Sequence, residues 1–238
     1  MIKIKILFIL IVLNCTSCLI YGQTLLGIKG GLNFSTIFQP FNANSSNNHR
    51  FTSYPSFCFE FNLKGRKPTH FHAGLAISYS QDSFKDQFES EGHFPIGKNI
   101  TYNVQCVRIT IFPELTVGKR CQFFFNLSPY LNIVINSSKS GSTWSYEYIG
   151  SYYELVYKNV NGSANDDFCK TVIGFQESVG FCYQINSWFG ITFEENGSIS
   201  CINLDPKTKS SLGNTIGLKL LLGVAFTIPS KTKDKILL

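Results

Sequence analysis

The fold is decided by residues 217–228, GLKLLLGVAFTI, near the end of the chain. Every even position from Leu218 to Ile228 is apolar, whereas the odd positions are mostly small or polar. A repeat of two residues is typical of a β-strand with one apolar face. A soluble strand buries that face against another layer, but a strand of a membrane barrel turns it toward lipid and keeps small and polar groups inside. The rest of the chain distinguishes these two cases.

The composition favours a membrane barrel. The chain has 238 residues, enough for one large β domain, and only 15% of them are charged. Phe alone, with 22 residues, outnumbers every charged residue type. Few charges and many aromatic side chains are unusual on a soluble surface and normal on a lipid-facing one. The net charge of +6 includes Lys3 and Lys5, and the remainder is too small to indicate a nucleic-acid partner.

The first 22 residues read as a signal peptide. Lys3 and Lys5 precede an apolar run at residues 6–13, and small residues follow, with a cleavage point before Gln23. We therefore expect a signal peptide at 1–22, an outer-membrane β-barrel domain at 23–229 and a basic C-terminal tail at 230–238. The tripeptide before residue 19 resembles a lipoprotein cleavage box, so acylation of Cys18 is an alternative.

Export also determines whether the cysteines can form disulfides. Six remain after cleavage, and an oxidising compartment permits disulfides. We predict a disulfide between Cys169 and Cys201, which sit at the outer ends of neighbouring expected strands. There is no CxxC pair and the spacings are wide, so we predict no metal site.

Eight segments alternate in polarity. They are residues 25–35, 57–63, 71–80, 107–117, 122–135, 173–182, 189–199 and 217–228. The connections between them are alternately long and short, which a soluble sandwich has no reason to show. We predict an all-β fold, an eight-stranded antiparallel up-and-down transmembrane β-barrel with short periplasmic turns and long extracellular loops.

Three motifs resemble a known family. They are GIKGGLNFS at 27–35, directly after the signal peptide, VRITIFPELTVGK at 107–119, and LSPYLNI at 127–133. In this order they resemble the PorT-type outer-membrane β-barrel proteins of Bacteroidetes-like bacteria. The resemblance implies an eight-stranded barrel in the bacterial outer membrane, in a family whose namesake is tied to the export of secreted cargo.

Charged residues at inward positions form the first candidate site. The inward set is Lys29, Glu60, Arg108, Glu114, Glu194 and Lys219. An eight-stranded barrel is just wide enough for its own side chains, so these three cations and three anions must pair. We interpret them as a structural ion-pair network; a narrow ion path is the alternative.

Two carboxylates occupy outward positions. Glu177 and Glu195 are about equally far from the turn at residues 186–187, so we expect them close together on strands six and seven. A carboxylate that faces lipid is unfavourable by a few kcal/mol. A β-bulge or register shift that turns both side chains away is one explanation, and a protein-contact face formed by Glu177 and Glu195 is the other.

The longest connection, residues 136–167, is rich in aromatic residues. We read it as a hairpin beyond the membrane and a candidate extracellular binding loop, formed by Trp144, Tyr146, Tyr148, Tyr152, Tyr153 and Tyr157. The alternative is a simple extension of the strands, with its aromatic residues at the membrane interface. The four histidines, His49, His70, His72 and His93, suggest no metal site, and His72 points inward, away from lipid substrates.

These features predict a small closed barrel with a structural or protein-docking role, without catalysis or cofactor. Its expected partners are outer-membrane lipid and a protein held by the extracellular loops or the outer face. Two alternatives remain open. One is a lipid-modifying outer-membrane enzyme, and the other is a soluble lipocalin-like carrier with its apolar face turned inward.

Overall fold

The computed structural model describes residues 23–38, 50–66, 70–90, 94–168, 170–203 and 214–228. The expected signal peptide, the basic tail and Cys18 lie outside these residues. The described chain forms ten strands. They are β1 (Gln23–Phe38), β2 (Arg50–Tyr54), β3 (Ser56–Arg66), β4 (Phe71–Glu89), β5 (Gly97–Val117), β6 (Cys121–Ile149), β7 (Tyr152–Ser163), β8 (Thr171–Gln184), β9 (Phe189–Asn203) and β10 (Asn214–Ile228).

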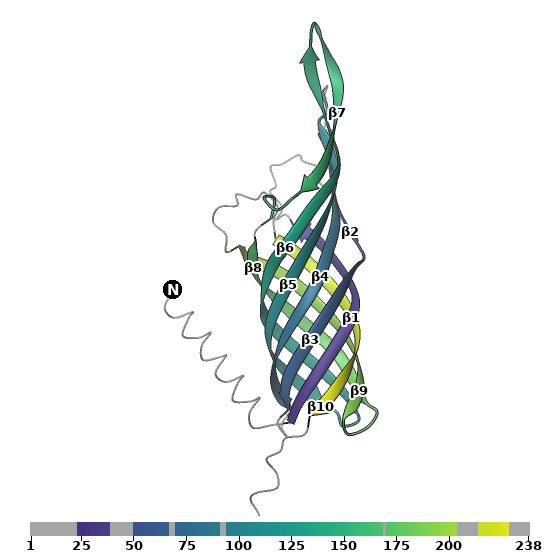
Figure 1. Ribbon diagram of the computed structural model, residues 1–238, viewed down its shortest axis with the longest axis vertical. Coiled ribbons are helices and arrows are strands. Elements are labelled where there is room, and N and C mark those ends of the chain that lie inside the picture. The colour runs from purple at the N-terminus through teal and green to yellow at the C-terminus, as the bar shows by residue number, and fades with distance from the viewer. Residues whose placement is uncertain are drawn as a thin grey trace, which may run out of the picture.

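Eight of these strands close into a ring. Each of β1, β3, β4, β5, β6, β8, β9 and β10 pairs antiparallel with the next, and β10 pairs with β1. The first and last strands therefore run side by side, purple against yellow in Figure 1. This confirms the predicted eight-stranded antiparallel barrel. No helix in the described part of the chain is long and apolar enough to span a membrane.

The apolar face of the ring points outward. Phe125 and Leu220 are 48% and 37% exposed, whereas Glu60 and Arg108 are only 5% and 6% exposed. A soluble carrier needs the opposite arrangement, with the apolar side chains enclosed. The lipocalin-like alternative is therefore wrong.

Two polar stretches that we expected to be loops contain strands. Strand β4 continues to Glu89 and β5 begins at Gly97, so the ladder between them runs far past the apolar band. Strand β2 lies in the polar stretch before residue 55 and pairs with the far end of β4. The expectation was wrong there because the outward positions are polar, and polar outward residues do not resemble a membrane strand.

The faces exchange polarity where the strands leave the apolar band. Below this level the outward side chains are apolar, as at Tyr79 and Val107; above it they are polar, as at Gln81 and Gln105. The inward side chains change in the opposite sense. We call the part beyond this level the distal extension: residues 81–89 of β4, 97–105 of β5, 136–149 of β6, all of β2 and β7, and residues 164–168.

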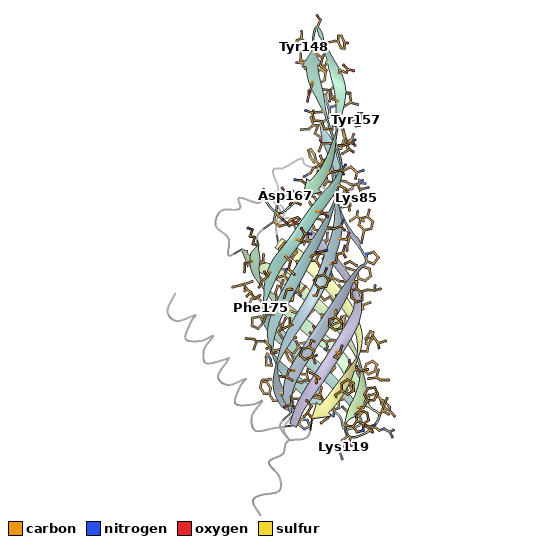
Figure 2. All side chains as sticks on the ribbon, in the orientation of Figure 1. Lys85, Lys119, Tyr148, Tyr157, Asp167 and Phe175 are labelled. Atoms are coloured by element: carbon orange, nitrogen blue, oxygen red, sulfur yellow. The ribbon has the colours of Figure 1, made fainter. Side chains whose placement is uncertain are left out.

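The distal extension projects far beyond the ring. Strands β6 and β7 form its tip, and the turns at residues 118–120 and 185–188 lie at the opposite end of the ring (Figure 1). Tyr148 marks the tip and Lys119 the opposite end (Figure 2). An ordered hairpin thus continues the barrel wall on one side, in agreement with the expectation for residues 136–167.

Candidate functional site

A three-residue ionic cluster lies in the middle of the ring. Lys29 Nζ donates to Glu60 Oε1 at 3.1 Å and also pairs with Glu194. Lys29 and Glu60 are directly opposite on β1 and β3, and Glu194 reaches across the interior from β9. All three side chains are at most 7% exposed. One cation therefore serves two buried carboxylates.

Glu114 pairs with a lysine that sequence reasoning placed in a turn. Lys64 Nζ lies 2.8 Å and 3.1 Å from the two carboxylate oxygens of Glu114. The same ammonium group is 4.9 Å from the centre of the Phe124 ring, a favourable cation–π distance. Lys64 has inward parity on β3, which is the signal that would have identified it.

Arg108 and Lys219 find neutral partners. Arg108 Nη1 donates to Gln176 Oε1 at 2.9 Å, and its guanidinium carbon lies 4.0 Å from the Tyr130 ring centre. Lys219 Nζ donates to Ser78 Oγ at 3.4 Å. All six predicted interior residues are thus enclosed. Lys64 joins them, and Asp82, at the start of the distal extension, adds a fourth carboxylate just beyond them.

Aromatic rings fill much of the remaining interior. Phe112 lies opposite Gly74, Phe124 opposite Gly180, and Tyr130 opposite Gly174. A Cβ at each of these glycines would lie 2.3–2.6 Å from the nearest ring carbon. Each ring therefore occupies the space that a side chain on the opposite glycine would need. Sequence reasoning missed Phe112 and Phe124, although both have inward parity. The cavity beside the Lys29 cluster is about 10 Å³, room for roughly one water molecule.

The two outward carboxylates face away from the interior. Glu177 and Glu195 are both exposed, on neighbouring strands β8 and β9, and their registers are offset by two residues. The register shift between these strands lies at residues 173–174 and leaves both side chains outward, so the bulge alternative is wrong. Glu177 lies over Gly197, where a Cβ would be 3.0 Å from its Oε1.

A groove surrounds Glu177 on the outer wall. Its volume is about 610 Å³, and apolar side chains such as Phe175, Ile199 and Leu218 form most of its rim. Phe175, a residue of β8, is labelled on the wall of the ring in Figure 2. The wall around Glu177 is therefore an apolar depression with one carboxylate, Glu195 does not line it, and a contact face here stays a prediction.

A small second core closes the base of the distal extension. It contains Phe84, Ile100, Tyr102, Val104, Cys106, Ala164 and Phe168. The rings of Phe84 and Tyr102 stack with centroids 5.4 Å apart, and Phe168 packs edge-on against both. These residues are inward-facing, like the charged set below them, but apolar.

Polar contacts tie residues 164–168 to this core. Asn165 Oδ1 accepts from the backbone N–H and the hydroxyl of Ser137, each at 2.9 Å. Asp167 pairs with Lys139 at 2.7 Å. Burial, together with the nearby carboxylates of Asp167 and Asp86, raises the pKa of the Tyr102 phenol to about 12.

The hairpin of β6 and β7 has one aromatic face. Directly opposite residues share a face, and the register pairs Trp144 with Tyr157, and Tyr148 with Tyr153. Tyr146 is on the same face, and Phe94 packs on Tyr146 and Tyr153 with centroids 5.4 Å and 4.4 Å away. Tyr152 is opposite Ile149 on the other face. Five of the six predicted loop residues therefore form one surface.

The remaining predictions concern cysteine and histidine. Cys201 is exposed with a free thiol, while Cys169 lies outside the described residues, so the disulfide stays a prediction. His70 Nδ1 is 3.1 Å from the Thr116 carbonyl oxygen, and His72 is buried inside the ring. His49 and His93 lie outside the described residues. Within those residues no three His, Cys, Asp or Glu side chains gather as metal ligands would.

Comparison with known proteins agrees with this architecture. A family model described as outer membrane protein beta-barrel domain matches residues 21–201. Among solved structures, neisserial surface protein A has 9% identity and a TM-score of 0.47, with 85% of this chain and 96% of that chain covered. Ail of Yersinia pestis has 10% identity, a TM-score of 0.44 and coverages of 87% and 99%. OprG from Pseudomonas aeruginosa has 8% identity, a TM-score of 0.47 and coverages of 88% and 97%. No curated protein sequence matches the chain.

Proposed function

Because the chain belongs to the outer membrane protein beta-barrel domain family, we propose that it is a non-catalytic docking protein that holds another protein through the aromatic face of its hairpin. The chain lies in the bacterial outer membrane, with the apolar face of its ring in lipid. The distal extension is on the extracellular side, at the end of the long connections.

The exposed aromatic face carries the proposal. Tyr148, Tyr153 and Tyr157 are 64%, 54% and 67% exposed, although they stand on one regular hairpin. Tyrosine offers a large contact area with little loss of conformational freedom on binding, and contiguous exposed apolar surface usually marks an interaction site. The hairpin also continues the wall of a closed barrel, so the aromatic face is presented in a fixed orientation.

The filled interior supports a structural rather than a conducting ring. Ion pairs and aromatic–glycine contacts occupy it, and the cavity beside Lys29 holds about 10 Å³. We propose that this interior is a plug that stabilises the barrel. The absence of catalysis is likewise a proposal. It is supported by the position of His72, which is enclosed in the ring, away from lipid substrates.

Two parts of the proposal are more specific than membership of the family. We propose that the protein belongs to the PorT-type group of Bacteroidetes-like bacteria, and that its docking role is linked to secretion or to surface interaction. The support is the ordered set of motifs at residues 27–35, 107–119 and 127–133. Deletion of residues 144–157 should then reduce secretion or surface attachment of a cargo protein while the barrel still assembles.

Site-specific photo-crosslinking in living cells tests the docking role. A benzoyl-phenylalanine at position 148 or 157 should form adducts with one protein, and the additional change Tyr153→Ala should weaken them. The matched control is position 152, which is equally exposed but faces the other way. Equal adducts from both faces, or adducts from neither, would contradict the proposal.

An activity assay tests the alternative of a lipid-modifying enzyme. Purified barrel incubated with lipopolysaccharide should release or transfer no acyl chain. Turnover that disappears in His72→Ala, in a variant that still folds, would favour the enzyme instead.

A further inference from the structure

Strand β7 has a long free edge. In the described part of the chain it pairs with β6 and with no other strand. It has 12 residues, YYELVYKNVNGS, with no proline and many β-favouring side chains. The opposite edge strand of the distal extension, β2, has only five residues. A long exposed edge without proline presents a row of unpaired backbone groups to another strand.

The charges on this hairpin are incompletely matched. Glu147 and Glu154 are directly opposite each other on β6 and β7, an unfavourable arrangement for like charges. Lys158 pairs with Glu147 at 2.5 Å, and both side chains are well exposed. Glu154 therefore faces a carboxylate whose lysine is already engaged. A strand that docks on β7 would be favoured if it brought a cation to Glu154.

We propose that β7 pairs antiparallel with β7 of a second copy of this chain, about a two-fold axis at Val156. In this register Glu154 lies opposite Lys158 of the second copy, and Lys158 lies opposite its Glu154. Leu155 lies opposite Tyr157 in the same way. The Lys158 ammonium, which already contacts Glu147 of its own copy, would then lie between that carboxylate and Glu154 of the other copy. This inference goes beyond the docking role, because it uses the edge of the strand and not the aromatic face.

The shape of the molecule decides how the two copies meet. The hairpin projects along the barrel axis, away from the membrane (Figure 1). Two copies in one membrane would present their β7 strands in parallel, which in register places Glu154 opposite Glu154 and Lys158 opposite Lys158. Antiparallel pairing requires the copies to point toward each other from two facing membranes. The proposed contact therefore joins two cells, or a cell and a vesicle.

Lipid nanodiscs that each hold one barrel provide the test. Any particle with two discs must be joined outside the membrane, and analytical ultracentrifugation counts discs per particle. Wild type should form two-disc particles. Glu154→Lys and Lys158→Glu should each weaken this association about tenfold or more, since each puts like charges opposite each other twice. The double variant with both changes should restore the association of two discs. Its Glu154→Lys change also places a cation opposite Glu147, which keeps the hairpin intact.

Disulfide trapping tests the register. In a background with Cys121, Cys169 and Cys201 changed to serine, Val156→Cys should crosslink to itself between discs, because directly opposite residues have Cα atoms about 4.5–5.5 Å apart. The matched control is Tyr152→Cys on the same face, whose own copy lies eight residues away, about 26 Å, beyond disulfide reach.

Three outcomes would overturn the inference. They are single discs only, two-disc particles unaffected by the charge reversals, and equal crosslinking at positions 152 and 156. None of these bears on the aromatic face when it is probed from position 148, which lies on β6 and not on the paired edge, so the two proposals fail separately.

Discussion

Phe124 and Gly180 lie directly opposite each other on β6 and β8, and the phenylalanine ring fills the space that a side chain at position 180 would take. A Cβ at position 180 would be 2.6 Å from the ring carbon and 2.3 Å from the carbonyl oxygen of Phe193. Such contacts require both the ring and the neighbouring strand to move.

Gly180→Ala should therefore destabilise the barrel by about 1–3 kcal/mol, the usual effect of an overfilled interior. The measurement is the urea midpoint of the barrel refolded in lipid. Gly30→Ala is the matched control, because its Cβ would meet nothing closer than 3.8 Å. If both variants unfold at the same urea concentration, the complementarity of ring and glycine contributes nothing.

Lys29 holds two buried carboxylates, so its removal should be costly. Lys29→Met leaves Glu60 and Glu194 close together without their cation, and a loss of about 3–5 kcal/mol is expected for an uncompensated buried charge. The triple variant with Glu60→Gln and Glu194→Gln should recover most of the loss. Equilibrium unfolding compares the three proteins, and an unchanged Lys29→Met would show that the cluster does not stabilise the ring.

The small second core at the base of the distal extension should loosen at high pH. Burial raises the pKa of Tyr102 to about 12, whereas an exposed tyrosine has a pKa of about 10. The unfolded chain therefore loses the phenol proton first. The stability linked to this group is fully present below pH of about 10 and is lost as pH rises toward 12. Hydrogen exchange in residues 97–105, expressed as protection relative to the intrinsic base-catalysed rate, should lose protection across this range, and Tyr102→Phe should abolish that loss. Protection that still falls in Tyr102→Phe would assign the effect to another group.

The same core should open without unfolding the ring. Phe168→Ala removes a ring that packs on Phe84 and Tyr102, with an expected local loss of about 3 kcal/mol. Limited proteolysis should then cut near residues 164–168 while the barrel fragment survives. The outward-facing control Phe175→Ala should leave the cleavage pattern of wild type. Loss of the whole barrel in Phe168→Ala would mean that core and ring unfold as one unit.

The outward carboxylates should destabilise an isolated barrel. Glu177→Leu and Glu195→Leu each remove a carboxylate from the lipid-facing wall, so each should stabilise the purified barrel by about 1–2 kcal/mol in lipid. Thermal unfolding in vesicles measures this. If the same substitutions abolish a complex in cells, Glu177 and Glu195 form a contact face. A purified variant that is monomeric, more stable and fully functional in docking argues against such a face.

Much of the ring could be predicted from sequence because lipid and interior impose a strict alternation. From Phe71 to Tyr79 and from Val107 to Val117 most outward positions are apolar, and these segments are correct. The alternation also identified six of the charged residues that the ring encloses. Lys64 was missed because its long side chain enters the ring from a position next to a turn.

The distal extension was harder to predict for a physical reason. Beyond Tyr79 and Val107 the solvent changes from lipid to water, so the same strands show polar residues outside and apolar residues inside. A segment with polar outward residues and apolar inward residues resembles a loop when it is read by the rule for lipid-facing strands. The single aromatic face of the hairpin depends on register, which pairs Trp144 with Tyr157, and register cannot be read from a list of aromatic residues.

The seam between β1 and β10 has a consequence for biogenesis. Once these strands meet, the ring is sealed and its interior is packed with side chains, so the hairpin that carries Glu147, Glu154 and Lys158 cannot pass through it. We therefore expect the charged tip to cross the bilayer before β1 closes on β10, because a ring that closed first would leave the tip in the periplasm.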